Sequence, residues 1–91
     1  MTGTFTVVVQ MWEESERSWG VRPDGYSLHL SEFDRLEYIK RYWDSLPAVP
    51  PEEYSRPCGT PYLAQVDEAI YNTVVKSNQG SRYFNNRYPP G

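Results

Sequence analysis

The stretch TFTVVVQMW, residues 4–12, decides the fold class of this 91-residue chain. Three consecutive valines favour an extended backbone, and polar and apolar residues alternate on either side of them. The face that is apolar enough to be buried holds Phe5, Val7, Val9 and Met11. The pattern predicts a β-strand over residues 4–12 with one face in the core. Residues 13–17 are charged and are expected to form a connection.

The next signal along the chain is a tight turn at residues 23–25. Pro23 presets φ for the first turn position, and Gly25 supplies a positive φ at the end. A three-residue loop would place Arg22 opposite Tyr26 and Trp19 opposite His29. Tyr26, Leu28 and Leu30 would then share the core face, with Ser27 and His29 pointing the other way. The sequence thus predicts a β-hairpin over residues 19–30.

Two helices are expected further along. Ser31 is a cap for the first, and the carboxylate of Asp34 can reach back as in a capping box. Apolar side chains at spacings of three and four form one stripe: Phe33, Leu36, Ile39, Tyr42, Trp43 and Leu46. Pro47 ends this helix. A second helix over residues 68–77 begins after the cap Asp67, although three β-branched residues at 73–75 weaken it.

The remaining segments complete a small α+β domain. Residues 47–61 contain five prolines and are expected to form a loop that is either functional or a cover for the core. Residues 62–66 alternate and predict a short strand. We therefore expect a single α+β domain over residues 1–80, a small antiparallel sheet of three to four strands with two helices packed on one face. A basic, aromatic tail follows over residues 81–91.

Composition narrows the class of protein. Hydrophobic residues make up 38% of the chain and aromatic residues 15%, which is too aromatic for a disordered segment. The single cysteine, Cys58, allows no intrachain disulfide, and a secreted domain of this size usually has several. Residues 1–5 lack a basic region and a long apolar run, so we expect no signal peptide. No stretch is apolar enough for a membrane span. These features predict a cytoplasmic protein.

Residues that could carry catalysis are few. A nucleophile–histidine pair would have to use His29, the only histidine, with Cys58 or a serine that lies in no known signature. A metal site needs three or four ligands at recognisable spacing, and no glycine-rich phosphate loop is present. We therefore expect a protein that is not an enzyme and has no metal or cofactor.

Aromatic residues on the sheet are the first candidates for partner binding. In the expected register Trp12, Trp19 and His29 lie away from the core face. Either a second layer from the same chain covers them, namely the proline-rich loop or the second helix, or they meet a partner, since Trp, Tyr and Arg are enriched in interface hot spots.

The tail supplies the second set of candidates. Residues 1–68 hold all 12 acids and 6 of the 9 bases, whereas residues 69–91 hold three bases and no acid. Such a tail can dock onto an acidic surface of a partner or of a second copy. Its candidate contact residues are Arg82, Tyr83, Phe84, Arg87 and Tyr88. Three cations on an acidic chain are too few for duplex nucleic acid.

The leading hypothesis is a non-enzymatic interaction protein that acts by occupying a surface on another macromolecule, for example as an inhibitor. Its size, acidity and lack of motifs resemble small accessory proteins of bacteria and their phages. The alternative is a protein that binds a small anionic ligand such as a nucleotide in a pocket of arginine and aromatic residues. A subunit interface is one place where such a pocket could form. That pocket would draw on Arg22, Arg56, Arg82 and Arg87. Homo-oligomerisation suits both hypotheses, because a small domain gains stability by burying a further face.

Overall fold

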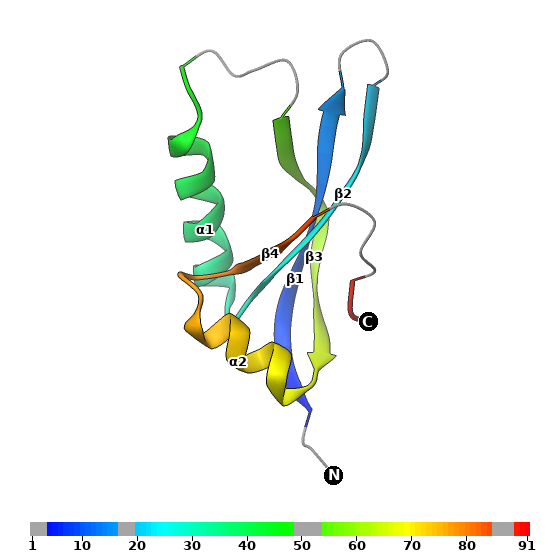
Figure 1. Cartoon of the computed structure of the whole chain (residues 1–91), viewed down its shortest axis with the longest axis vertical. Helices are drawn as coiled ribbons and strands as arrows, with labels where there is room; N and C mark the ends of the chain where they lie inside the picture. The colour runs from blue at the N-terminus through cyan, green and yellow to red at the C-terminus, as the bar shows by residue number, and fades with distance from the viewer. Residues whose placement is uncertain (1–3, 17–19, 49–53, 85–88) are drawn as a thin grey trace.

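The computed structural model describes residues 4–16, 20–48, 54–84 and 89–91. These residues form a four-stranded antiparallel sheet, in the order β3-β1-β2-β4, and two helices (Figure 1). In chain order the elements are β1 (Phe5–Glu16), β2 (Gly20–His29), α1 (Glu32–Ser45), β3 (Tyr54–Val66), α2 (Glu68–Lys76) and β4 (Ser81–Tyr83). The expected class, an α+β domain with a small antiparallel sheet and two helices, is confirmed.

Strand β1 lies in the middle of the sheet, as its alternating pattern predicts for a strand with a buried face. Val7 and Val9 are 1% and 0% exposed, and Val9 pairs with Leu28 of β2 and with Tyr62 of β3. The charged residues 13–16 continue this strand, so the expected connection was wrong. They are held there because both neighbouring strands extend equally far: Glu14 pairs with Arg22 and with Ser55.

The predicted turn at residues 23–25 is a β-bulge inside β2. Met11 pairs with Tyr26 and Glu13 pairs with Pro23, so two residues of β2 stand opposite Trp12 alone. Gly25 has a φ of 80°, and a Cβ there would lie 1.9 Å from the carbonyl oxygen of Tyr83. Only glycine therefore fits where β2 passes β4.

The predicted cross-strand pairs fail with that turn. Arg22 pairs with Glu14 and His29 pairs with Val8, because residues 20–29 form one strand that pairs with β1 and do not fold back into a hairpin. The side chains of Ser27 and Leu28 point to opposite faces of the sheet, as predicted, and both are buried. Leu30, which was predicted to share the core face, lies beyond the end of the strand and is 38% exposed. Trp19 lies outside the described residues.

Residues 54–61, expected to be a loop, are the first half of β3. Val9 pairs with Tyr62 and Met11 with Cys58, so residues 59–61 bulge opposite Gln10, with a φ of 69° at Gly59. Prolines are tolerated here because β3 is an edge strand of the sheet. The strand expected over residues 62–66 is correct as the second half of the same element.

Both predicted helices are confirmed together with their caps. The Ser31 hydroxyl accepts a hydrogen bond from the backbone N–H of Asp34 at 3.1 Å, and the Asp67 carboxylate accepts one from that of Ile70 at 2.9 Å. These bonds satisfy backbone donors that the first turn of a helix leaves free.

The two helices cover opposite faces of the sheet rather than sharing one. Helix α2 places Val74 in the apolar core, and Tyr71 stacks on Phe5 with ring centroids 4.6 Å apart. Helix α1 lies over the other face of β1, whose side chains alternate along the strand with those in the core. The rings of Tyr42 and Trp12 meet there, with centroids 5.0 Å apart. Both faces carry side chains too large or too polar to leave uncovered, so each has its own helix.

Helix α1 presents only part of its apolar stripe to the sheet. Phe33, Leu36 and Trp43 are 58%, 54% and 41% exposed, and no described residue of α1 is fully buried. Tyr38 and Tyr42 point towards the sheet instead. The reason is the polarity of the covered face: it carries Gln10, Ser27 and His29, which need hydrogen-bonding neighbours.

The beginning of the predicted tail belongs to the sheet. Residues 81–83 form β4 and pair with residues 26–28 of β2. Residues 89–91 lie beside β3, where the Tyr62 hydroxyl donates a 2.9 Å hydrogen bond to the carbonyl of Pro90 (Figure 1). Among the described residues, neither helix is long and apolar enough to cross a membrane.

Candidate functional site

A chain of hydrogen bonds runs beneath α1 through three buried side chains. Trp12 Nε1 donates to the Ser27 hydroxyl at 2.7 Å, and this hydroxyl lies 2.8 Å from Nε2 of His29. The other ring nitrogen, Nδ1, lies 2.7 Å from the carbonyl of Gln79. Because a carbonyl only accepts, Nδ1 carries the proton and Nε2 accepts from Ser27. Every donor and acceptor in the chain is therefore used.

This geometry resembles a serine nucleophile beside a histidine base, but the surroundings prevent that chemistry. Ser27 and His29 are both 0% exposed, so no substrate reaches the hydroxyl. The hydroxyl oxygen already accepts a bond from Trp12, which a nucleophile would have to release. Burial lowers the pKa of His29, which keeps the imidazole neutral and suited to this fixed role. The Trp12 and His29 rings that these bonds orient are the ones on which Tyr38 and Tyr42 of α1 pack.

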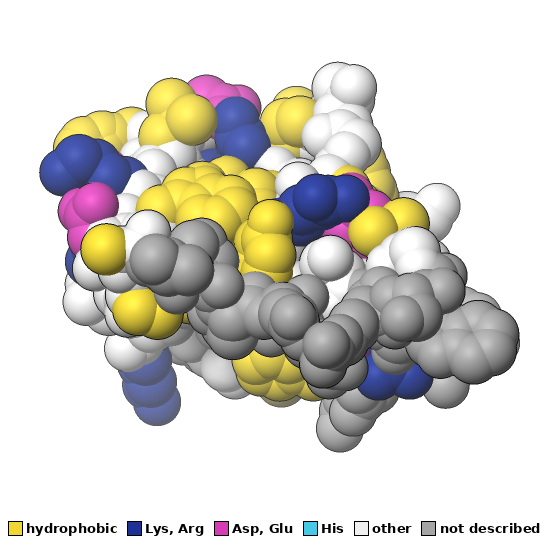
Figure 2. Space-filling view, turned by 90° about the horizontal axis from the view of Figure 1, so that it is seen from above, with side chains coloured by type: hydrophobic (Ala, Val, Ile, Leu, Met, Phe, Trp, Pro, Cys, Tyr) yellow, Lys and Arg dark blue, Asp and Glu magenta, His cyan; other side chains and the backbone are white. Residues whose placement is uncertain are grey.

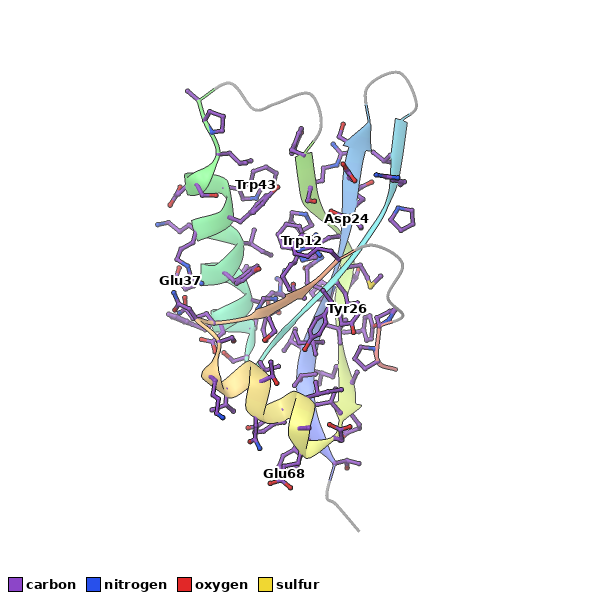
Figure 3. The ribbon with its side chains drawn as sticks, viewed as in Figure 1. Trp12, Asp24, Tyr26, Glu37, Trp43 and Glu68 are labelled. Atoms are coloured by element: carbon purple, nitrogen blue, oxygen red, sulfur yellow. The ribbon has the colours of Figure 1, made fainter. Side chains whose placement is uncertain are left out.

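Arg82 forms a second polar cluster on the same face. Its guanidinium lies 4.6 Å from the ring centroid of Trp12 and 4.2 Å from that of Phe84, and so is held between two aromatic faces. Its Nη2 pairs with the Asp24 carboxylate at 3.3 Å, and its Nη1 donates to the Asp24 carbonyl at 2.8 Å. Trp12 and Asp24 lie near one another at the middle of the sheet (Figure 3).

Hydrogen bonds connect this cluster to α1 and β3. The Ser55 hydroxyl of β3 donates to the Asp24 carboxylate, and the Tyr42 hydroxyl of α1 donates to the Ser55 carbonyl. Burial raises the pKa of Tyr42, so its hydroxyl stays protonated as a donor. Asp24 thus connects β2, β3 and β4 beneath one end of α1.

The partner-binding residues expected from the sequence divide into three groups. Trp12 and His29 are buried beneath α1, so a layer from the same chain covers them, and this layer includes the first helix rather than the second. Tyr83 stacks on Tyr26 at 4.8 Å, whereas Phe84 is 52% exposed. The remaining candidates, Trp19, Arg87 and Tyr88, lie outside the described residues.

The arginines proposed for an anionic ligand do not converge. Arg22 pairs with Glu14 at 3.1 Å and Arg56 with Glu13 at 3.2 Å, while Arg82 is held by Asp24. A cavity of about 300 Å³ does lie beside Arg22, but Glu13 lines it too. An anion there would compete with one carboxylate and meet another. Arg87 lies outside the described residues.

The surface that the sequence analysis missed is a groove between the start of α1 and β3. It has a volume of about 350 Å³ and is lined by Val8, Leu30, Ser31, Glu32, Pro61, Tyr62 and Leu63. Leu63 is 69% exposed and lies in the lining of this groove. The sequence signal was present, since Leu63 breaks the alternation of β3 by placing an apolar residue on the face away from Ala64.

The apolar surface continues along α1 beyond the groove. Leu36 lies one helical turn past Glu32, and Trp43 lies two turns further on the same side. Trp43 reaches back towards β3, where its ring lies 6.2 Å from that of Tyr54 (Figure 3). At the end of the molecule where α1 finishes, hydrophobic side chains are gathered between basic and acidic ones (Figure 2). We call Leu30, Leu36, Trp43 and Leu63 the α1–β3 surface.

No site for a metal ion is formed by the described residues, because they contain no group of three or more His, Cys, Asp or Glu side chains that could hold one. Comparisons of the chain with protein-family models, with curated proteins and with solved structures found no match.

Proposed function

We propose that this chain is a non-enzymatic interaction protein that binds another protein through the α1–β3 surface. The observation that supports this most is the exposure of its large apolar side chains, 38% to 69%, beside a groove. Exposed large apolar side chains that gather beside a groove often mark a binding site. Binding would occupy a surface of the partner, which is how a small inhibitor or accessory protein acts.

The chemistry of the surface indicates what kind of partner fits. Trp43 is the residue type most enriched in hot spots, and leucines supply apolar area around it. Charged residues of both signs border the apolar side chains: Glu32 pairs with Arg35, and Lys40 pairs with Asp44 at 3.7 Å. A partner with an apolar patch bordered by charged groups of both signs would be complementary.

Hydrogen bonds from α1 to the rest of the chain, together with the ring contacts on Trp12 and His29, support this proposal by holding the helix in position. Arg35 donates to Gln10 Oε1 at 2.7 Å, and Arg41 donates to Gln79 Oε1 at 2.5 Å. The groove is formed between α1 and β3, so its width depends on these bonds. Trp12, His29 and Arg82 are therefore assigned to positioning the surface, not to touching the partner.

Site-specific photo-crosslinking in extracts of the producing cells tests the proposal. A photoreactive residue in place of Leu63 should join the chain to one protein, which can then be purified and titrated by fluorescence anisotropy. Leu63→Ala and Leu36→Ala should each weaken binding roughly 10- to 100-fold, as expected for hot-spot truncations. Both variants should remain within about 0.5 kcal/mol of wild-type stability, because the side chains are exposed.

Val75 provides the matched control. It is 50% exposed but lies on α2, away from the α1–β3 surface. A photoreactive residue at this position should give no such adduct, and Val75→Ala should bind normally. Equal crosslinking from both positions, or unchanged affinity in the leucine variants, would rule out the α1–β3 surface as the binding site.

A further inference from the structure

The face of the sheet opposite α1 carries a contact of a distinctive kind, between an aromatic side chain and the chain's own prolines. The Tyr62 hydroxyl donates to the carbonyl of Pro90 at 2.9 Å. A Cβ added to Gly91 would lie 3.1 Å from a carbon of the Tyr62 ring and 3.7 Å from the Cβ of Ala64. The segment Pro89-Pro90-Gly91 is therefore packed closely against β3.

The chemistry of this contact suits an extended proline-rich segment. Consecutive prolines favour the polyproline II conformation, in which backbone carbonyls have no internal hydrogen bond. Such a carbonyl is free to accept a bond from a tyrosine hydroxyl, while the pyrrolidine rings pack against aromatic and apolar side chains. Burial raises the pKa of Tyr62, so its hydroxyl stays protonated and able to donate.

The surface extends further than residues 89–91 reach. Tyr62 pairs with Val9, and the next pair along the same two strands is Met11 with Cys58. These two residues line a cavity of about 300 Å³ together with Trp12, Glu13, Val21, Arg22 and Pro23. The residues that line it do not include Pro89, Pro90 or Gly91. A segment longer than residues 89–91 could bind at Tyr62 and continue into this cavity.

We propose that Tyr62 and the neighbouring Met11-lined cavity form a binding site for a proline-rich segment of another protein, and that residues 89–91 occupy part of it in cis. The chain's own segment then acts as a built-in competitor. Its contact is small, and the described part of it includes one side-chain hydrogen bond, so an outside ligand can displace it. Tyr62 also lines the groove beside the α1–β3 surface, whereas Met11 and Cys58 of the cavity do not. The site does not depend on the partner proposed for that surface.

A direct test uses a fluorescein-labelled peptide of about ten prolines, a length that forms polyproline II, titrated with the full chain by anisotropy. The double variant Pro89→Ser with Pro90→Ser should bind this peptide more tightly, by roughly two- to tenfold, because it loses the competing contact. Tyr62→Phe in the same background keeps the ring, removes the hydroxyl, and should weaken binding by a similar factor.

Tyr54→Phe is the matched control, because Tyr54 also lies on β3 but its ring meets Trp43 of α1. It should leave peptide affinity unchanged. Absence of peptide binding to the double variant, or an equal loss in the Tyr54 and Tyr62 variants, would overturn the proposal. Light scattering on the wild type gives a further check: a dimer that the proline variant converts to a monomer would mean that residues 89–91 bind a second copy and not their own chain.

Discussion

The two faces of the sheet are held to their helices by different kinds of interaction. On the α2 face, the side chains of Val7, Val9, Leu28 and Val74 are apolar and almost completely buried. On the α1 face, equally buried positions carry Ser27 and His29, joined by hydrogen bonds. Apolar packing depends on volume and has no strong directional requirement, whereas each buried donor and acceptor needs its own partner at a set distance.

This difference explains why the α1 face can carry an exposed apolar surface beside it. A helix held by apolar packing turns its apolar stripe inwards, as α2 does with Val74. Helix α1 is held through Arg35, Tyr38 and Tyr42, so Phe33, Leu36 and Trp43 of its stripe are left on the outside. Substitutions on the two faces should therefore fail in different ways.

The largest expected effect is on the α1 face, at the buried ion pair. Arg82→Met keeps most of the side-chain volume but leaves the Asp24 carboxylate buried without its cation. We expect a loss of about 4 kcal/mol in the free energy of unfolding, measured by urea denaturation. Lys40→Met is the control, since its pair with Asp44 is exposed and should contribute less than about 0.5 kcal/mol. Similar losses in the two variants would show that the Arg82 pair is not a stabilising element.

On the apolar face, Leu28→Ala should cost about 3 kcal/mol of unfolding free energy, because the side chain is 1% exposed and its removal leaves a cavity. Leu63→Ala removes the same atoms from an exposed position and should cost less than about 0.5 kcal/mol. Thermal unfolding followed by circular dichroism measures both. A large loss at Leu63 would indicate that its surface is part of the core.

A smaller effect is expected from Ser27→Ala, which removes only one oxygen. It leaves the Trp12 N–H and the His29 Nε2 buried without partners, at a cost of about 2 kcal/mol. Ser45→Ala removes an exposed hydroxyl that bonds the Tyr42 carbonyl and should be close to neutral. If Ser27→Ala proves as stable as Ser45→Ala, the hydrogen-bond chain does not hold the α1 face together.

The smallest expected effect is a dependence of stability on pH that only the α1 face produces. Burial lowers the pKa of His29 in the folded chain, so the unfolded chain takes up a proton first as pH falls. The contribution of His29 to the free energy of unfolding is complete above the pKa of histidine in the unfolded chain, about 6.5. It is lost as pH falls below that value, with a slope of at most roughly 1.4 kcal/mol per pH unit. Urea titrations between about pH 7 and 5.5 measure the slope, and His29→Gln should flatten it. An unchanged slope in that variant would assign the titration to other groups.

Local signals in the sequence predicted the elements that depend on local interactions. The caps Ser31 and Asp67 and the alternation around Val7 and Val9 gave both helices and the central strand. Gly25 and Gly59 could not be interpreted in the same way, because a glycine with positive φ serves a turn or a bulge equally well. Only pairing with β1 decides between the two, and that pairing is between residues far apart in the chain.

The candidate site was harder to predict for a related reason. The stripe on α1 was identified correctly as apolar, but its direction depends on the polarity of the sheet face beneath it. That face is polar only because Gln10, Ser27 and His29 come together from two strands. Trp12 and His29 were assigned to a partner surface, whereas α1 covers them. Three residues of the exposed surface, Leu30, Leu36 and Trp43, are ones that the sequence pattern predicts to be inside.

The strand order has a consequence for how fast the chain can fold. Among the paired strands, only β1 and β2 follow one another in the sequence. The other pairs join distant residues: Phe5 must meet Val66, and Tyr26 must meet Tyr83, before the sheet is complete. Closing such long loops costs entropy before the contacts form, so domains of this kind fold more slowly than helical bundles. The β1–β2 hairpin is the local nucleus that this order allows, and the edge strands β3 and β4 are expected to join it last.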